Sequence, residues 1–299
     1  MNWLTIIIIA YFLNAVAMII DKSLLKKSIS EPVVYTFYIG LLGLIFIPIL
    51  MPFGFHWLSL GMIFISLLAG IFFIIALLIF FKALKSNDAS QVIPLIGGLN
   101  PLMILIFAYF LVSERLNVRE LIALGFIIIG SYIITLNHTR EGLKLSVETL
   151  KLGIFSAFFF GLSYTLTKVV YQETAFINGF IWTRLGALVA VFSLLFNSGN
   201  RRLIFGNTQK TSQSIKLIFL FGQALAGISF LMVNYAIFLG SVTLTNALQG
   251  LQYVFLFLII IFLSKKYPEI LEEKLNLKII VQKIFAIIFI SLGLVFIAL

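Results

Sequence analysis

Ten apolar stretches recur along the chain, and they constrain its fold more than any other feature of the sequence. They lie at 3–21, 32–51, 58–82, 89–112, 117–137, 151–171, 176–196, 215–238, 242–264 and 277–298. About 20 apolar residues suffice for a helix to cross a bilayer, and continuous apolarity excludes a barrel, whose strands alternate. The sequence therefore predicts an all-α polytopic membrane protein with ten transmembrane helices.

Composition excludes several other classes of protein. Only 11% of the residues are charged and 62% are hydrophobic, which is far from the balance of a soluble domain. The absence of Cys removes disulfides, thiolate nucleophiles and Cys-ligated metals. The excess of 21 Lys and Arg over 11 Asp and Glu is expected in the connections of a membrane protein, so we predict no nucleic-acid partner.

The connection at 138–150 divides the ten stretches into two halves that echo each other. Moving the first half by 146 positions sets Lys22 over Lys168 and Tyr38 over Arg184. Five is an odd number of spans, so the second copy enters the membrane from the opposite side. We therefore expect two inverted five-helix repeats, 1–137 and 151–299, an arrangement that recurs in secondary transporters.

The basic residues predict an orientation. The odd-numbered connections and adjoining helix ends hold 17 of the 21 Lys and Arg, whereas the even-numbered connections hold only Arg115 and Arg119. The positive-inside rule then places the odd-numbered connections in the cytoplasm and both termini outside.

Two cations fall inside predicted spans. Arg184 lies midway along the seventh, where an Arg costs about 2.5 to 3.5 kcal/mol. It either binds a substrate carboxylate or phosphate in a watery cavity, or it is structural, bonded to carbonyls or to Glu31 or Glu173. Lys168 lies nearer a helix end, where it either extends to the interface or contacts substrate.

The fourth and ninth spans are the richest in amides, prolines and glycines. The candidate substrate-binding residues on them are Gln91, Asn246, Gln249, Gln252 and Tyr253. The candidate kink residues in the fourth span are Pro94, Gly98 and Pro101. Such residues either line a cavity or pack helices closely together. Tyr38, the repeat partner of Arg184, either contacts substrate or anchors its span at the interface.

The search for catalytic groups finds little. No Asp or Glu lies in the middle of a span, and the two histidines, His56 and His138, fall in connections of different halves. The nucleophile and nucleotide motifs of known enzymes are also missing. We predict that the protein is not an enzyme and that it has no cofactor and no metal.

The motifs of the first half resemble the EamA-type family of the drug/metabolite transporter superfamily. They are Ala83-Leu84, Pro94, Asn100-Pro101, Glu114-Arg115-Leu116, Gly125 and Gly130. The second half resembles the pattern more loosely, through Lys168, Arg184, Tyr235-Ala236, Glu273-Lys274-Leu275-Asn276 and Gly293. The resemblance implies a multi-pass carrier of small metabolites in a prokaryotic plasma membrane, with a central cavity at the fourth and ninth helices.

Two departures from the family pattern bear on function. Tyr38 stands where the pattern usually has Arg, and relatives commonly keep both termini in the cytoplasm. The expected function is alternating-access transport of a small polar metabolite, such as an amino acid, organic acid or sugar derivative. Two alternatives stay open: a flippase-like carrier of a lipid-linked substrate, and a structural membrane subunit. The expected partners are the small-molecule substrate and the lipid bilayer.

Overall fold

The computed structural model describes residues 2–25, 31–86, 89–135, 146–206, 213–264 and 277–299. These residues form helices and no strands. The helices are α1 (Trp3–Leu25), α2 (Pro32–Gly43), α3 (Phe46–Leu50), α4 (Leu60–Ser86), α5 (Ala89–Leu111), α6 (Val118–Thr135), α7 (Val147–Glu173), α8 (Phe176–Ser193), α9 (Ser198–Gly206), α10 (Gln213–Leu239), α11 (Val242–Ala247), α12 (Gly250–Ser264) and α13 (Leu277–Ala298). Two short 3₁₀ turns follow α3 and α8.

Nine segments of the described residues are long and apolar enough to cross a membrane. The one remaining predicted span is the fourth, 89–112, which corresponds to α5. The apolar part of α5, Leu95–Leu111, is shorter than the other nine segments. The predicted all-α fold with many membrane spans is confirmed.

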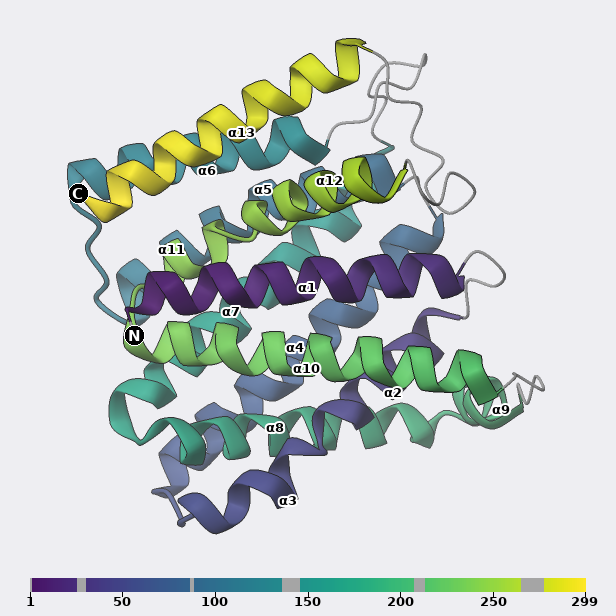
Figure 1. Ribbon diagram of the computed structural model, residues 1–299. Coiled ribbons are helices and arrows are strands. Elements are labelled where there is room, and N and C mark those ends of the chain that lie inside the picture. Colours follow the sequence, from purple (N-terminus) through teal and green to yellow (C-terminus); the bar gives the residue numbers. More distant parts are fainter. Residues whose placement is uncertain (1, 26–30, 87–88, 136–145, 207–212, 265–276) are drawn as a thin grey trace.

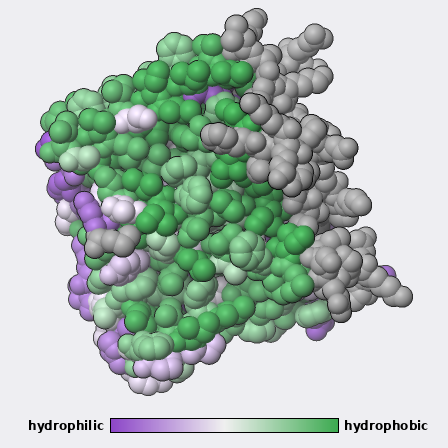
Figure 2. All heavy atoms as spheres, viewed as in Figure 1, coloured by the Kyte–Doolittle hydropathy of each residue, from purple (hydrophilic) through white to green (hydrophobic). Residues whose placement is uncertain are grey.

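The long helices lie side by side, with both chain termini at one end of the bundle (Figure 1). Figure 2 shows hydrophobic residues over the middle of the molecule and hydrophilic residues gathered at the end that carries the termini. Such an apolar band fits a bilayer, in which helices satisfy the backbone polar groups.

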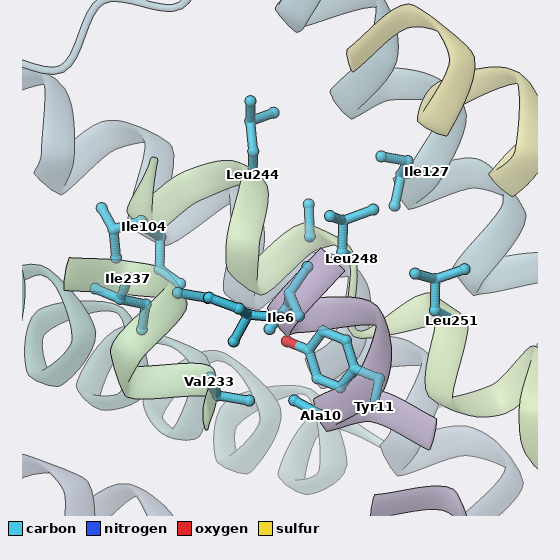
Figure 3. Close-up of a cluster of buried hydrophobic side chains, with 14 of the residues drawn as sticks. Ile6, Ala10, Tyr11, Ile104, Ile127, Val233, Ile237, Leu244, Leu248 and Leu251 are labelled. Carbon is cyan, nitrogen blue, oxygen red and sulfur yellow. The ribbon is translucent and has the colours of Figure 1, made fainter. Parts of the chain in front are cut away.

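The largest core joins helices from both halves of the chain (Figure 3). It contains Ile6 and Tyr11 from α1, Ile104 from α5 and Leu244 from α11. The Tyr11 hydroxyl donates to the Thr245 carbonyl at 3.0 Å, which attaches α1 to α11. The core therefore fixes the interrupted ninth span against the first.

Glycines bring α4 and α8 into backbone contact. A Cβ added at Gly70 would lie 2.1 Å from the Thr183 carbonyl oxygen, and one at Gly186 would lie 2.3 Å from the Leu67 carbonyl oxygen. No side chain larger than hydrogen fits at either position without moving a backbone. This contact holds the middle of α8 close to α4.

The structure differs from the sequence-based boundaries in several places, and one of them is the second span, which is interrupted at Leu44–Ile45 between α2 and α3. Helix α9 occupies part of the predicted connection 197–214, and α7 begins inside the predicted connection 138–150, of which 138–145 lies outside the described residues. The ninth span is interrupted at Leu248–Gln249, between α11 and α12. The fourth span is one continuous helix, α5, without a local break, and the kink at Pro94, Gly98 and Pro101 stays a prediction. The division into two repeats stays a prediction.

Candidate functional site

Arg184 lies halfway along the seventh span and is surrounded by aromatic rings. Arg184 is only 6% exposed. The guanidinium carbon is 5.2 Å from the ring centre of Phe73, 5.4 Å from that of Phe180 and 4.5 Å from that of Phe230. These rings come from α4, α8 and α10, so three helices enclose the cation. Cation–π attraction offsets part of the cost of burying it.

The guanidinium has no hydrogen-bond acceptor among the described residues. Its Nε is buried and unpaired, and neither proposed structural partner reaches it. Glu31 instead pairs with Lys85, and no ion pair joins Arg184 to Glu173 within the described chain. A buried charge without hydrogen bonds is costly, so Arg184 is a cation that the fold leaves uncompensated.

Tyrosine hydroxyls supply the polar surroundings of Arg184. Tyr164 and Tyr171 lie within electrostatic reach of the guanidinium. Tyr11 in turn lies within electrostatic reach of Tyr164 and Tyr253. These buried hydroxyls, from α1, α7 and α12, connect the Arg184 region to the ninth span. Sequence reasoning had singled out Tyr253 but not Tyr11 or Tyr164, although a Tyr well inside an apolar span is a usable signal.

Lys168, a second cation inside a span, is fully engaged by the protein. Its Nζ donates to the carbonyls of Ile237 at 2.8 Å, Phe238 at 3.3 Å and Gly240 at 2.7 Å. These carbonyls are left free where α10 ends, as at any helix C-terminus. An ammonium has three N–H groups, and all of them are used here.

Glu114 caps α11, the helix that follows α10. Its Oε1 accepts from the Ser241 hydroxyl at 2.8 Å and from the Thr243 N–H at 3.2 Å, while Oε2 accepts from the Val242 N–H at 3.1 Å. These donors belong to the start of α11, where N–H groups lack helical partners and favour an anion. The α10–α11 junction is therefore held by two opposite charges: the Lys168 ammonium bonds carbonyls at the end of α10, and the Glu114 carboxylate accepts from donors at the start of α11.

The amides of the ninth span differ in how far the protein satisfies them. Asn246 is buried, and its Nδ2 donates to the Val242 carbonyl at 2.9 Å. The Gln252 Oε1 accepts from Asn14 Nδ2 at 2.7 Å, and its Nε2 lies against the sulfur of Met18. Gln252 is therefore engaged with α1. Gln249 is half-buried at the interruption of the span.

The remaining predicted residues are dispersed. Tyr38 is 43% exposed, and its hydroxyl donates to the Ile204 carbonyl of α9 at 3.3 Å. The side chains of Gln91 and Pro94 lie outside the described part of α5. Pro101 is buried, and a Cβ added at Gly98 would meet no atom within 4 Å.

α5 also contributes a polar group that sequence reasoning left aside. Asn100 is 5% exposed, and its Oδ1 has no donor among the described residues. Within the same residues, no group of three or more His, Asp, Glu or Cys could hold a metal ion.

These features define an integral, multi-pass membrane protein with a buried, uncompensated cation at mid-span. Residues 1–136 match the model of the EamA-like transporter family. The resemblance carried by the motifs of the first half is thereby confirmed, and it indicates a membrane transporter of the drug/metabolite superfamily. Members of this family are transporters rather than enzymes.

A solved structure supports the fold over nearly the whole chain. Described as "Crystal structure of protein", it is similar with a TM-score of 0.70 and 14% sequence identity, over 97% of each chain. This similarity shows the fold alone. No curated protein matches the chain.

Proposed function

We propose that the protein is a secondary transporter that moves a small metabolite bearing a carboxylate or phosphate by alternating access. Amino acids, organic acids and sugar derivatives with such a group are the candidate substrates. The observation that carries the proposal is the Arg184 guanidinium, buried at mid-span without an acceptor among the described residues.

An anionic substrate would supply the acceptors that the protein does not. A guanidinium presents its donors in a planar fork that matches a carboxylate or phosphate. Charge-assisted hydrogen bonds of this kind are about twice as strong as neutral ones, and removal from water strengthens them further. The enclosing rings of Phe73, Phe180 and Phe230 keep the guanidinium in place while leaving its donors unused.

The neighbouring polar groups would orient the substrate. We assign this role to Tyr164, near Arg184, and to Asn246, Gln249 and Tyr253 on the ninth span. Gln91 and Tyr38 stay candidates for a different step of the transport cycle. Lys168 and Gln252 hydrogen-bond the protein itself, so we propose that they position helices rather than contact substrate.

Uptake into proteoliposomes tests this function. We expect vesicles containing the purified protein to accumulate a radiolabelled organic acid or phosphorylated sugar in exchange for the same solute inside. Arg184→Leu should abolish the uptake, and Arg184→Lys, which retains charge but not the planar fork, should retain a fraction of it. Equal uptake by the native protein and Arg184→Leu would contradict the proposal.

We further propose that the two halves are inverted repeats in a plasma membrane with both termini outside. Single cysteines in this Cys-free chain test the orientation. Ser59 and Ser198 are both exposed, and they lie in connections assigned to opposite sides. A membrane-impermeant thiol reagent added to intact cells should label Ser59→Cys and not Ser198→Cys; the reverse pattern would mean that both termini lie inside.

A further inference from the structure

Helix α9 is a short helix that crosses the end of the bundle opposite the termini (Figure 1). It covers Ser198–Gly206 and links α8 to α10. Helices of nine residues are marginal in water by themselves, because nucleation is costly. The surroundings must therefore stabilise α9.

The protein stabilises α9 through its capped start and through the one face that packs on the bundle. The Asn197 Oδ1 accepts from the N–H groups of Gly199 at 2.8 Å and Asn200 at 3.2 Å, which caps the start of the helix. Ile204 is 3% exposed and packs into the core formed by α2, α4 and α8. Its carbonyl accepts from the Tyr38 hydroxyl.

The flanks of α9 expose large apolar side chains. Leu203 is 42% exposed, Phe205 is 61% exposed, and Phe196, just before the helix, is 88% exposed. Water disfavours these surfaces, but the boundary between headgroups and acyl chains accommodates them. Because α9 lies at the end of a transmembrane bundle, that boundary is the environment at hand.

The same helix exposes two arginines, for which the described residues supply no counter-charge. Arg201 and Arg202 are exposed, and neither pairs with a carboxylate of the described residues. No Asp or Glu occurs in the sequence between Glu173 and Glu269. At about 100° per residue, Arg202 lies almost opposite the buried Ile204 and so points away from the bundle.

We propose that α9 is an interfacial helix that binds the headgroups of anionic phospholipids. Arg201 and Arg202 contact the lipid phosphates, while Phe196, Leu203 and Phe205 enter the acyl boundary. Helices that combine apolar side chains with basic residues bind anionic membrane surfaces, through burial of the apolar side chains and attraction to the lipid headgroups. This contact holds the α8–α10 connection at the membrane independently of which solute the protein carries.

Lipid quenching tests the proposal directly. Leu203→Cys, the only thiol in the chain, is labelled with bimane and reconstituted into phosphatidylcholine vesicles that contain phosphatidylglycerol. In one sample the phosphatidylglycerol carries brominated acyl chains, and in the other an equal amount of phosphatidylcholine does. We expect stronger quenching by the brominated anionic lipid, corresponding to a local enrichment of about fivefold for each arginine.

A double variant and a matched control assign the effect to α9. Arg201→Gln with Arg202→Gln should make quenching by the two brominated lipids equal. Lys151→Gln, which removes an exposed cation from α7 near the same end, should leave the preference intact. Quenching by brominated phosphatidylcholine in every variant verifies that α9 still reaches the acyl boundary.

Three results would overturn the proposal. Equal quenching of the unsubstituted α9 by both lipids would show no headgroup preference. Absence of quenching by either lipid would place α9 away from the bilayer. Loss of the preference on adding inorganic phosphate, but not chloride of equal ionic strength, would identify a site for free phosphate instead.

Discussion

Lys168 and Arg184 both lie within spans of the second half of the chain, and the protein treats them in opposite ways. The Lys168 ammonium donates to three backbone carbonyls at the end of α10. The Arg184 guanidinium lies among Phe rings and has no acceptor among the described residues. In a low-dielectric interior such a difference separates a cation that stabilises the fold from one that the fold must support.

The difference follows from where each side chain meets the backbone. α10 ends beside Lys168, and the carbonyls freed there are natural acceptors for a cation. α8 passes Arg184 without interruption, so every nearby helical carbonyl is already bonded. Burial alone therefore does not identify a substrate-binding cation. A buried cation whose N–H donors are unused is the better candidate.

Removal of the Lys168 ammonium should have the largest effect on stability. Lys168→Met leaves three carbonyls without a donor, and we expect the free energy of unfolding to fall by about 3 kcal/mol. Thermal unfolding of the detergent-purified protein measures this change. Lys151→Met, on the exposed side of α7, is the control and should leave the melting temperature unchanged. Equal melting of both variants would break the contrast between Lys168 and Arg184.

Removal of the Arg184 guanidinium should leave stability intact and abolish binding. An unpaired charge is costly to bury, so its replacement by an apolar side chain should be neutral or stabilising. We expect Arg184→Leu to melt at or above the temperature of the native protein while its affinity for an anionic substrate falls about 100-fold, or about 2.7 kcal/mol. Equilibrium binding of radiolabelled substrate measures the second effect. A large loss of stability would mean that Arg184 has a structural partner.

Neutralisation of Glu114 should have an intermediate effect. Glu114→Gln replaces one acceptor oxygen by an amide that faces N–H donors of α11, so we expect a loss of about 1 to 2 kcal/mol. Thermal unfolding again measures it. The same substitution at Glu120, which bonds only within its own exposed helix start, is the matched control. If Glu114→Gln melts as the control does, the cap on α11 contributes nothing.

The smallest predicted effect concerns the turn that presents Glu114. Ser113 has a φ of 56°, a left-handed conformation that costs a non-glycine residue about 1 to 2 kcal/mol. Ser113→Gly removes that cost but adds freedom to the unfolded chain, for a net gain of about 0.5 kcal/mol. A slightly higher melting temperature than that of Ser113→Ala, which retains the strain, is the expected result. A lower one would indicate that the serine side chain itself stabilises the turn.

The sequence predicted the fold well because membrane insertion depends on properties that can be read locally. Runs of apolar residues of bilayer length define spans without knowledge of tertiary contacts. The same reasoning drew attention to Arg184 and Lys168, since a charge in such a run is costly wherever it lies. The motifs around Glu114 indicated the family.

The roles of these residues could not be predicted, because they depend on contacts between segments far apart in the chain. Lys168 meets the carbonyls of α10 only after folding, and so does Glu114 with α11. The interruption at Leu248–Gln249 has no Pro to announce it, whereas α5, with two prolines, continues unbroken. Helix α9 was not predicted because it has only nine residues and its first five, Ser-Gly-Asn-Arg-Arg, are typical of a loop.

The central claim is that Arg184, and not Lys168, binds an anionic substrate. The most direct test is the shift in melting temperature that a panel of carboxylates and phosphorylated sugars causes in the native protein, Arg184→Leu and Lys168→Met. A ligand at 100 times its Kd should stabilise the native state by about 2.7 kcal/mol. We predict a shift for the native protein and for Lys168→Met, from its lower starting temperature, and none for Arg184→Leu. A ligand-induced shift of equal size in Arg184→Leu would contradict the account.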